Sequence, residues 1–204
     1  FENDGAITWD LITERVNADL ANVLGNLVNR TVAMVNKYFG GVIPESGEAG
    51  DFDAELKSIC ENAIENIEAK MKTWHIADSL DEIWKVVDRS NKYIDETAPW
   101  ALAKDESKKA RLAQVMYNLC ESIRIISVFV APFMPDTSAK IREQLGLGAI
   151  ESWNECGIFG KEATYTVVKG DIIFPRIDLE KELEELTERW VYLNELYEKI
   201  QEQK

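Results

Sequence analysis

Apolar residues recur every three or four positions along most of the chain, which is the period of an α-helix with one buried face. Gly40-Gly41 is a signal that ends the first such segment, and Pro99 disfavours helical backbone at Ala98, where the third must break. Pro132 follows the fourth. The pattern predicts helices over residues 8–39, from Asp51 or Asp53 to 74, 78–96, 106–131, 137–145 and 178–203.

The helical period fails between residues 146 and 176, a glycine-rich stretch. Two short runs, 164–168 and 171–174, flank a Lys169-Gly170 turn, and this arrangement predicts a small β-hairpin. In the last helix the apolar steps then alternate between four and three, which makes a heptad stripe suited to packing on one partner. Packing of that helix on its own domain is the simpler alternative.

These elements predict an all-α fold. Short connections favour an antiparallel helix bundle over residues 1–145, followed over 146–204 by a linker, the hairpin and the C-terminal helix. With 46% hydrophobic and 29% charged residues, the composition of the 204-residue chain is that of a soluble globular protein. No apolar run approaches the length of a membrane span, and no signal peptide opens the chain. We therefore expect a cytoplasmic protein without a membrane partner.

The residues needed for the common catalytic and metal sites are missing. His75 is the single histidine, and nothing around it suggests a nucleophile or a zinc site. Cys60, Cys120 and Cys156 lie far apart and form no CxxC pair, so buried thiols in a reducing compartment are expected. No glycine-rich phosphate loop occurs. The sequence predicts no catalytic residue, no metal and no cofactor within this chain, and the first residue, Phe1, suggests a segment excised from a longer protein.

The net charge of −14 argues against a partner that is a polyanion. The charge is uneven, because residues 85–124 hold eight Lys and Arg against six acids, a balance of +2. A protein that reads unstacked bases also depends less on phosphate contacts than one that grips a duplex. An RNA partner therefore stays compatible with the composition.

A polar row on the first helix does not fit core packing. Asn22, Asn26 and Arg30 are four residues apart and lie away from the apolar stripe. An Asn amide offers a donor and an acceptor, and the Arg guanidinium is a planar fork that bonds to bases or stacks on them. Hydrogen bonds within the bundle are an equally good explanation of this row.

A second feature is the segment from Asn91 to Trp100, which ends in Ala98-Pro99-Trp100. A tryptophan just after a proline break can be held at the surface, where its indole would stack on an unpaired base. Spacing alone favours the alternative, a tryptophan that caps the core.

Together these segments resemble the methionyl-tRNA synthetase family of class I synthetases, in the order that the family has them. The first helix and the Asn91–Trp100 segment resemble the family's anticodon-binding domain, and the remaining segments resemble a following turn and the stretch that returns toward the catalytic domain. The matching segments are 17–30, 91–100, 130–135 and 173–178.

The resemblance implies a domain that reads the CAU anticodon of methionine tRNAs. Trp100 matches the tryptophan on which the first anticodon base stacks. Asn26 and Arg30 match polar residues that contact the anticodon bases. Asn91 and Asp95 lie in the same motif and are carried over with them as candidate RNA-binding residues.

The resemblance also implies what this chain lacks. The family's catalytic signatures and zinc-knuckle cysteines are absent, so the catalytic domain, with its ATP and zinc, would lie upstream of Phe1. That domain would be a partner within the same parent chain, and the C-terminal helix would pack back on the bundle or on it. Two alternatives stay open: a helical protein-interaction module, and the anticodon domain of another class I synthetase.

Overall fold

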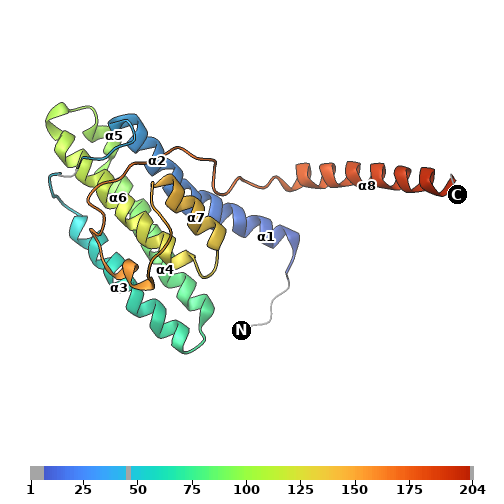
Figure 1. Ribbon diagram of the computed structural model, residues 1–204, viewed down its shortest axis with the longest axis horizontal. Coiled ribbons are helices and arrows are strands. Elements are labelled where there is room, and N and C mark those ends of the chain that lie inside the picture. The colour runs from blue at the N-terminus through green and yellow to red at the C-terminus, as the bar shows by residue number, and fades with distance from the viewer. Residues whose placement is uncertain (1–6, 45–46, 203–204) are drawn as a thin grey trace.

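The structure, a computed structural model, describes residues 7–44 and 47–202 and is a helix bundle. Four long helices, α2 (Asn26–Phe39), α3 (Asp53–Lys72), α4 (Ile76–Thr97) and α6 (Lys109–Val130), lie along one another, and successive ones reverse direction (Figure 1). Every residue from Asn118 to Val130 is buried, because α6 is surrounded by α2, α3, α4 and α7 (Pro135–Gln144). The predicted all-α class is confirmed for the described residues.

The first predicted helix is continuous but changes its hydrogen bonding midway. It runs as α1 (Trp9–Arg15), then as a π-helix, η1 (Val16–Gly25), and then as α2. Bonds from i to i+5 replace the i to i+4 bonds in η1, and this underwinds the helix. Gly40 ends α2 with a φ of 63°, which glycine adopts without steric cost. The predicted bounds are thus correct, whereas the π-helix is a new feature.

Asp53, a predicted helix cap, is the first residue of α3 and holds three elements together. Its carboxylate accepts hydrogen bonds from both terminal nitrogens of Arg111 at 2.7 Å and from the Tyr93 hydroxyl at 2.6 Å. It also accepts the backbone N–H of Gly50 at 3.1 Å, so the loop before α3 is fixed on α4 and α6.

The chain from residue 153 to 165 crosses the bundle as a strap bound to a buried ion pair on α6. Glu121 and Arg124 are fully buried and bonded to each other, with N···O distances of 2.9 and 3.1 Å. Arg124 donates to the carbonyl of Glu155, in the short helix η3 (Trp153–Gly157). Glu121 accepts the Tyr165 hydroxyl and the backbone N–H of Gly160. The ion pair therefore supplies polar partners for the backbone groups of the strap that lie against α6.

The predicted β-hairpin is wrong. No strand is assigned in 7–44 or 47–202, and residues 164–168 instead lie beside the loop after α2. The Ile43 N–H donates to the Tyr165 carbonyl at 3.1 Å, and the Val167 N–H donates to the Gly41 carbonyl at 2.7 Å. Tyr165 and Val167 are buried and alternate with exposed neighbours, as expected for an extended segment. Burial of these two side chains in the core, rather than the Lys169-Gly170 turn, therefore determines that residues 164–168 pair with the loop after α2.

The C-terminal helix, α8 (Leu179–Glu202), forms where it was predicted but does not pack on the bundle. It extends away from the body of the molecule (Figure 1), and its large apolar side chains are exposed. Packing on its own bundle, one of the expected arrangements, is therefore not observed. Packing on a catalytic domain stays a prediction, as does the division of the chain at residue 145.

Replacing Arg124 with methionine should destabilise the bundle by about 3–5 kcal/mol, because Glu121 would remain buried without its cation. The Glu121→Gln, Arg124→Met double variant should regain part of that loss, since it buries no charge. Urea unfolding followed by circular dichroism measures both free energies. A double variant less stable than Arg124→Met would contradict this account of the pair.

Stability should fall in acid through Asp53. Burial of this carboxyl opposes its ionisation, but the hydrogen bonds from Arg111, Tyr93 and Gly50 outweigh that effect and hold its pKa below the ordinary 3.8. A carboxyl whose pKa is lower in the folded state stabilises the fold above about pH 4 and loses this contribution as the pH falls through the folded pKa.

Asp53→Asn should therefore lower the free energy of unfolding by about 1–3 kcal/mol near pH 7. It should also reduce the difference between the free energy of unfolding at about pH 7 and that at about pH 3. Urea midpoints at the two pH values test this. Asp51→Asn is the control, because Asp51 is exposed two residues away and its backbone carbonyl, rather than its carboxylate, accepts the hydrogen bond from Arg111. If the stability of Asp53→Asn differs between the two pH values as much as that of the parent does, Asp53 is not the cause of the loss of stability in acid.

Candidate functional site

A sharp turn at the end of α4 presents Trp100. Ala98 has a φ of 42°, in the left-handed region, because Pro99 excludes the helical conformation there and the chain must leave α4. The turn starts the short helix α5 (Pro99–Leu102). Pro99 is buried and Leu102 packs on the core, while the Trp100 side chain between them is 44% exposed. The prediction of a surface tryptophan is thus consistent with the local geometry.

Arg30 on α2 reaches the end of α4. Its guanidinium donates to the Asp95 carboxylate at 3.4 Å, with side-chain exposures of 33% and 69%. A long, exposed pair of this kind contributes little to stability and is easily exchanged for another partner. Arg30 and Asp95, two candidate RNA-binding residues from separate sequence segments, therefore contact each other at the surface.

The side chain of Asn91 serves the fold. Its amide donates to the carbonyls of Val23 and Val87, both at 3.3 Å, and so links α4 to the π-helix η1. This contact fixes how α2 and α4 lie against each other, and hence where Arg30 and Asp95 meet. Asn91 borders the candidate surface as a positioning residue.

Asn26 is exposed one turn before Arg30, at the first residue of α2. Asn22 does not continue this row. Its side-chain oxygen accepts two hydrogen bonds from Arg176, at 2.7 and 3.1 Å. Asn22 lies in η1, whose underwinding turns it out of the row that an α-helix would form. The predicted polar row is reduced to Asn26 and Arg30.

Asn17 and Asn22 hold the returning segment 173–178 against η1, a role that the sequence did not reveal. The Asn17 amide donates to the Ile177 carbonyl at 2.9 Å and accepts the Ile177 N–H at 2.8 Å. Gly25 lies beside Phe174 of that segment, and the closest contact that a Cβ there would make is with the Leu20 carbonyl oxygen of η1, at 3.1 Å. The resemblance had marked both segments, but their contact spans 160 residues and no local pattern reports it.

The predicted local surplus of positive charge does not form a basic face. The arginines in 85–124 form ion pairs within the bundle: Arg89 pairs with Glu55 and Glu96, Arg111 with Asp53, and Arg124 with Glu121. Lys108 and Lys109 pair with acids of their own turn, at 3.8 and 3.0 Å. Arg89, Arg111 and Arg124 therefore add no unpaired positive charge to the surface near Trp100.

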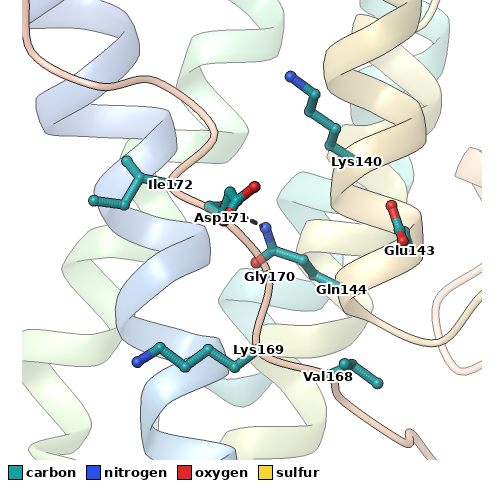
Figure 2. Close-up of a pocket in the computed structure, with 8 residues that line it drawn as sticks. All are labelled: Lys140, Glu143, Gln144, Val168, Lys169, Gly170, Asp171 and Ile172. Atoms are coloured by element: carbon teal, nitrogen blue, oxygen red, sulfur yellow. Dashed lines mark hydrogen bonds between the residues drawn. The ribbon is translucent and has the colours of Figure 1, made fainter.

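A polar hollow of about 440 Å³ lies between α7 and residues 168–172. Figure 2 shows Gln144 pointing at the crossing backbone, where its amide donates to the Asp171 carbonyl at 2.9 Å. The hollow is lined by opposite charges, among them Lys140 and Glu143, and by none of the predicted site residues. The hollow therefore marks where residues 168–172 lie against α7.

Within 7–44 and 47–202, no group of three or more His, Cys, Asp or Glu side chains is arranged to hold a metal ion. Over the same ranges, no helix has the length and apolar character needed to cross a bilayer.

Residues 43–195 match the family model described as the anticodon binding domain of methionyl tRNA ligase. The chain is 49% identical over 187 residues to the methionine–tRNA ligase of Clostridium tetani, an alignment that covers 91% of this chain and 29% of the relative. It is 44% identical to that of Bacillus subtilis, covering 90% of this chain and 28% of the relative. The chain thus spans less than a third of the length of these relatives.

The fold is also similar to solved structures of longer proteins. The apo form of Mycobacterium tuberculosis methionyl-tRNA synthetase superposes with a TM-score of 0.78 at 31% identity, over 86% of this chain and 36% of that one. A structure of the same enzyme bound by methionyl-adenylate gives 0.77 at 32% identity, over 84% and 34%. The match over residues 43–195 decides the assignment: the chain belongs to the family of anticodon-binding domains of methionyl-tRNA ligases.

Proposed function

We propose that this chain reads the CAU anticodon of methionine tRNAs with a surface made by Asn26, Arg30, Asp95 and Trp100, which Asn91 positions. The observation that carries the proposal is the Ala98-Pro99 turn, which buries Pro99 yet leaves Trp100 half-exposed. An indole held this way stacks on any unpaired base, and the first anticodon base is its proposed partner.

The other side chains of the proposed surface form hydrogen bonds to the bases or orient the groups that do. The Arg30 fork donates two parallel hydrogen bonds to a base edge once it leaves Asp95, and the Asn26 amide both donates and accepts. Asp95 orients Arg30 when RNA is absent, at the 3.4 Å seen here. α5 lies against the last turn of α2, because Leu102 and Tyr38 line the same small hollow. The helix that carries Asn26 and Arg30 thus borders the element that carries Trp100.

The relatives that match this chain are full methionine–tRNA ligases. We infer that the chain works within such an enzyme, in the cytoplasm. Its catalytic domain, upstream in the same polypeptide, would hold ATP and the zinc and charge the bound methionine tRNA. The chain's own contribution is to bind the anticodon loop and so select the tRNA.

Trp100→Ala should weaken binding of a CAU anticodon stem-loop by about 1–3 kcal/mol, the range for a lost base–aromatic stack. Trp100→Phe should retain part of the affinity, because a smaller ring still stacks. Trp74→Ala is the matched control: this indole is 78% exposed but lies at the far end of the bundle, between α3 and α4 (Figure 1).

Fluorescence anisotropy with a labelled stem-loop measures each dissociation constant, and circular dichroism verifies the fold of each variant. If Trp100→Ala binds as tightly as the parent while remaining folded, Trp100 is not part of the site.

Arg30→Ala should lose both affinity and discrimination, by about 1–3 kcal/mol between CAU and a stem-loop altered at one anticodon base. Arg30→Lys should keep some affinity but little discrimination, because an ammonium cannot bond in the planar fork of a guanidinium. Arg15→Ala is the matched control, since Arg15 lies on the same continuous helix and pairs with Asp19 at the same 3.4 Å.

The control should bind both stem-loops as the parent does. Lys108→Ala should weaken both stem-loops about equally, as expected for a phosphate contact. If Arg30→Ala and Arg15→Ala lose the same affinity for the stem-loops, Arg30 contributes only general electrostatic attraction. That result would contradict the proposal that Arg30 reads a base.

A further inference from the structure

The last turns of α4 are hydrogen-bonded to neighbouring helices on two sides. On one side the Asn91 amide donates to the Val23 carbonyl of η1 at 3.3 Å. On the other side the Tyr93 hydroxyl donates to the Asp53 carboxylate of α3 at 2.6 Å and accepts the Asn118 amide of α6 at 3.0 Å. Each residue of an α-helix is turned by about 100° from the one before, so Asn91 and Tyr93 point to nearly opposite sides of α4.

Stability alone does not explain the Tyr93 hydroxyl, because a phenylalanine there would fill the core without needing a polar partner. Tyr93 is fully buried, and the buried Asn118 that bonds to it is held in turn by the Gln114 amide at 2.8 Å. Burial raises the pKa of Tyr93, so the hydroxyl keeps its proton and remains the donor to Asp53. A buried polar network whose members are all bonded fixes one arrangement of the helices that carry it.

Arg89 strengthens the same link between α4 and α3. Its buried guanidinium pairs with Glu55 of α3 at 3.0 Å and with Glu96 of α4 at 2.8 Å. The guanidinium carbon also lies over the Tyr93 ring, 6.0 Å from the ring centre. Two successive turns of α4 are therefore attached to α3 by polar contacts, which are directional in a way that apolar packing is not.

The rotation of this end of α4 decides where the proposed RNA-binding groups lie. Asp95 is two residues beyond Tyr93 on the same helix, and Trp100 follows through the Ala98-Pro99 turn. The Thr97 hydroxyl donates to the Tyr93 carbonyl at 2.6 Å, so the residue before the turn is bonded to the turn of helix that Tyr93 anchors. Exposed side chains lie far from the helix axis, and a small rotation of α4 therefore displaces them more than it displaces the backbone.

We propose that Tyr93 is a positioning residue for RNA recognition. Its hydroxyl fixes the rotation of the end of α4, because Asp53 and Asn118 hold it from two other helices. Trp100 therefore meets the first anticodon base in one fixed place, and the entropy lost on binding is smaller. Tyr93 is buried and acts only through this placement. The inference rests on the proposed function, since the surface that it concerns is the one proposed to read the anticodon.

Tyr93→Phe tests this role, because it removes the hydroxyl and keeps the ring, while Asp53 keeps both of its hydrogen bonds from Arg111. The variant should bind the CAU stem-loop about threefold to tenfold more weakly, as expected for the loss of one hydrogen bond. It should also prefer CAU less strongly over a stem-loop altered at the first anticodon base, because the hydrogen-bonding groups then meet the base in a poorer geometry. Fluorescence anisotropy measures both dissociation constants.

Tyr165→Phe is the matched control. Tyr165 is also buried, and its hydroxyl donates to the Glu121 carboxylate, which keeps its ion pair with Arg124. Tyr165 lies outside α4, so this variant should lose stability in urea and yet bind both stem-loops as the parent does. Equal losses of affinity in the two variants would show that Tyr93 acts through stability alone and would overturn the proposal.

A double variant separates this role from the proposed function. If Tyr93 acts by placing Trp100, Tyr93→Phe should change the affinity by less than about twofold in the Trp100→Ala background, because the two losses are then not additive. An undiminished loss in that background would overturn the positioning role. If Trp100→Ala weakens binding but Tyr93→Phe does not, the proposed function stands and only this inference fails. If Trp100→Ala binds as the parent does, the proposed site fails, and this inference with it.

Discussion

The buried pair of Glu121 and Arg124 is the interaction on which the closure of the bundle depends. Two charges without access to water are tolerated only when every remaining polar atom is satisfied. Here the strap from 153 to 165 supplies those partners through backbone groups and the Tyr165 hydroxyl, whose pKa is raised far above its ordinary range by burial and by the neighbouring carboxylate. The strap in turn brings Tyr165 into the core, and Val167 follows it there. Ion pair and strap are therefore one folding unit, and neither is explained without the other.

The candidate surface is built from features that are weak when taken singly. An exposed ion pair, an exposed asparagine and a half-exposed tryptophan each occur on many proteins. They gain meaning here because Asn91 and the Ala98-Pro99 turn fix their relative places through backbone contacts. Rigid placement before binding lowers the entropy that base recognition would otherwise cost. The proposed function therefore relies on stacking and hydrogen bonds for affinity, since Arg89, Arg111 and Arg124 are paired within the bundle.

Sequence patterns predicted what depends on local spacing. Helix bounds followed from the apolar period, and the break at Ala98 followed from Pro99. The hairpin failed because residues 164–168 pair with a loop more than a hundred positions earlier, a choice made by the core. The surplus of positive charge in 85–124 does not appear at the surface, because Arg89 and Arg111 pair with acids of α3 and Arg124 is buried with Glu121 on α6. The roles of Asn26, Arg30 and Trp100 came from family resemblance, because spacing alone left a structural explanation open for each.

The π-helix η1 has a consequence for the part of the chain that precedes it. Each residue of these turns rotates the chain by less than the roughly 100° of an α-helix, so η1 sets which way α1 and Asn17 face relative to α2. Asn17 meets Ile177 in this arrangement, and Asn26 and Arg30 follow η1 on an ordinary α-helix. The underwound turns thus act as an angular spacer: they set the direction in which the polypeptide enters the bundle independently of the surface proposed to meet the RNA.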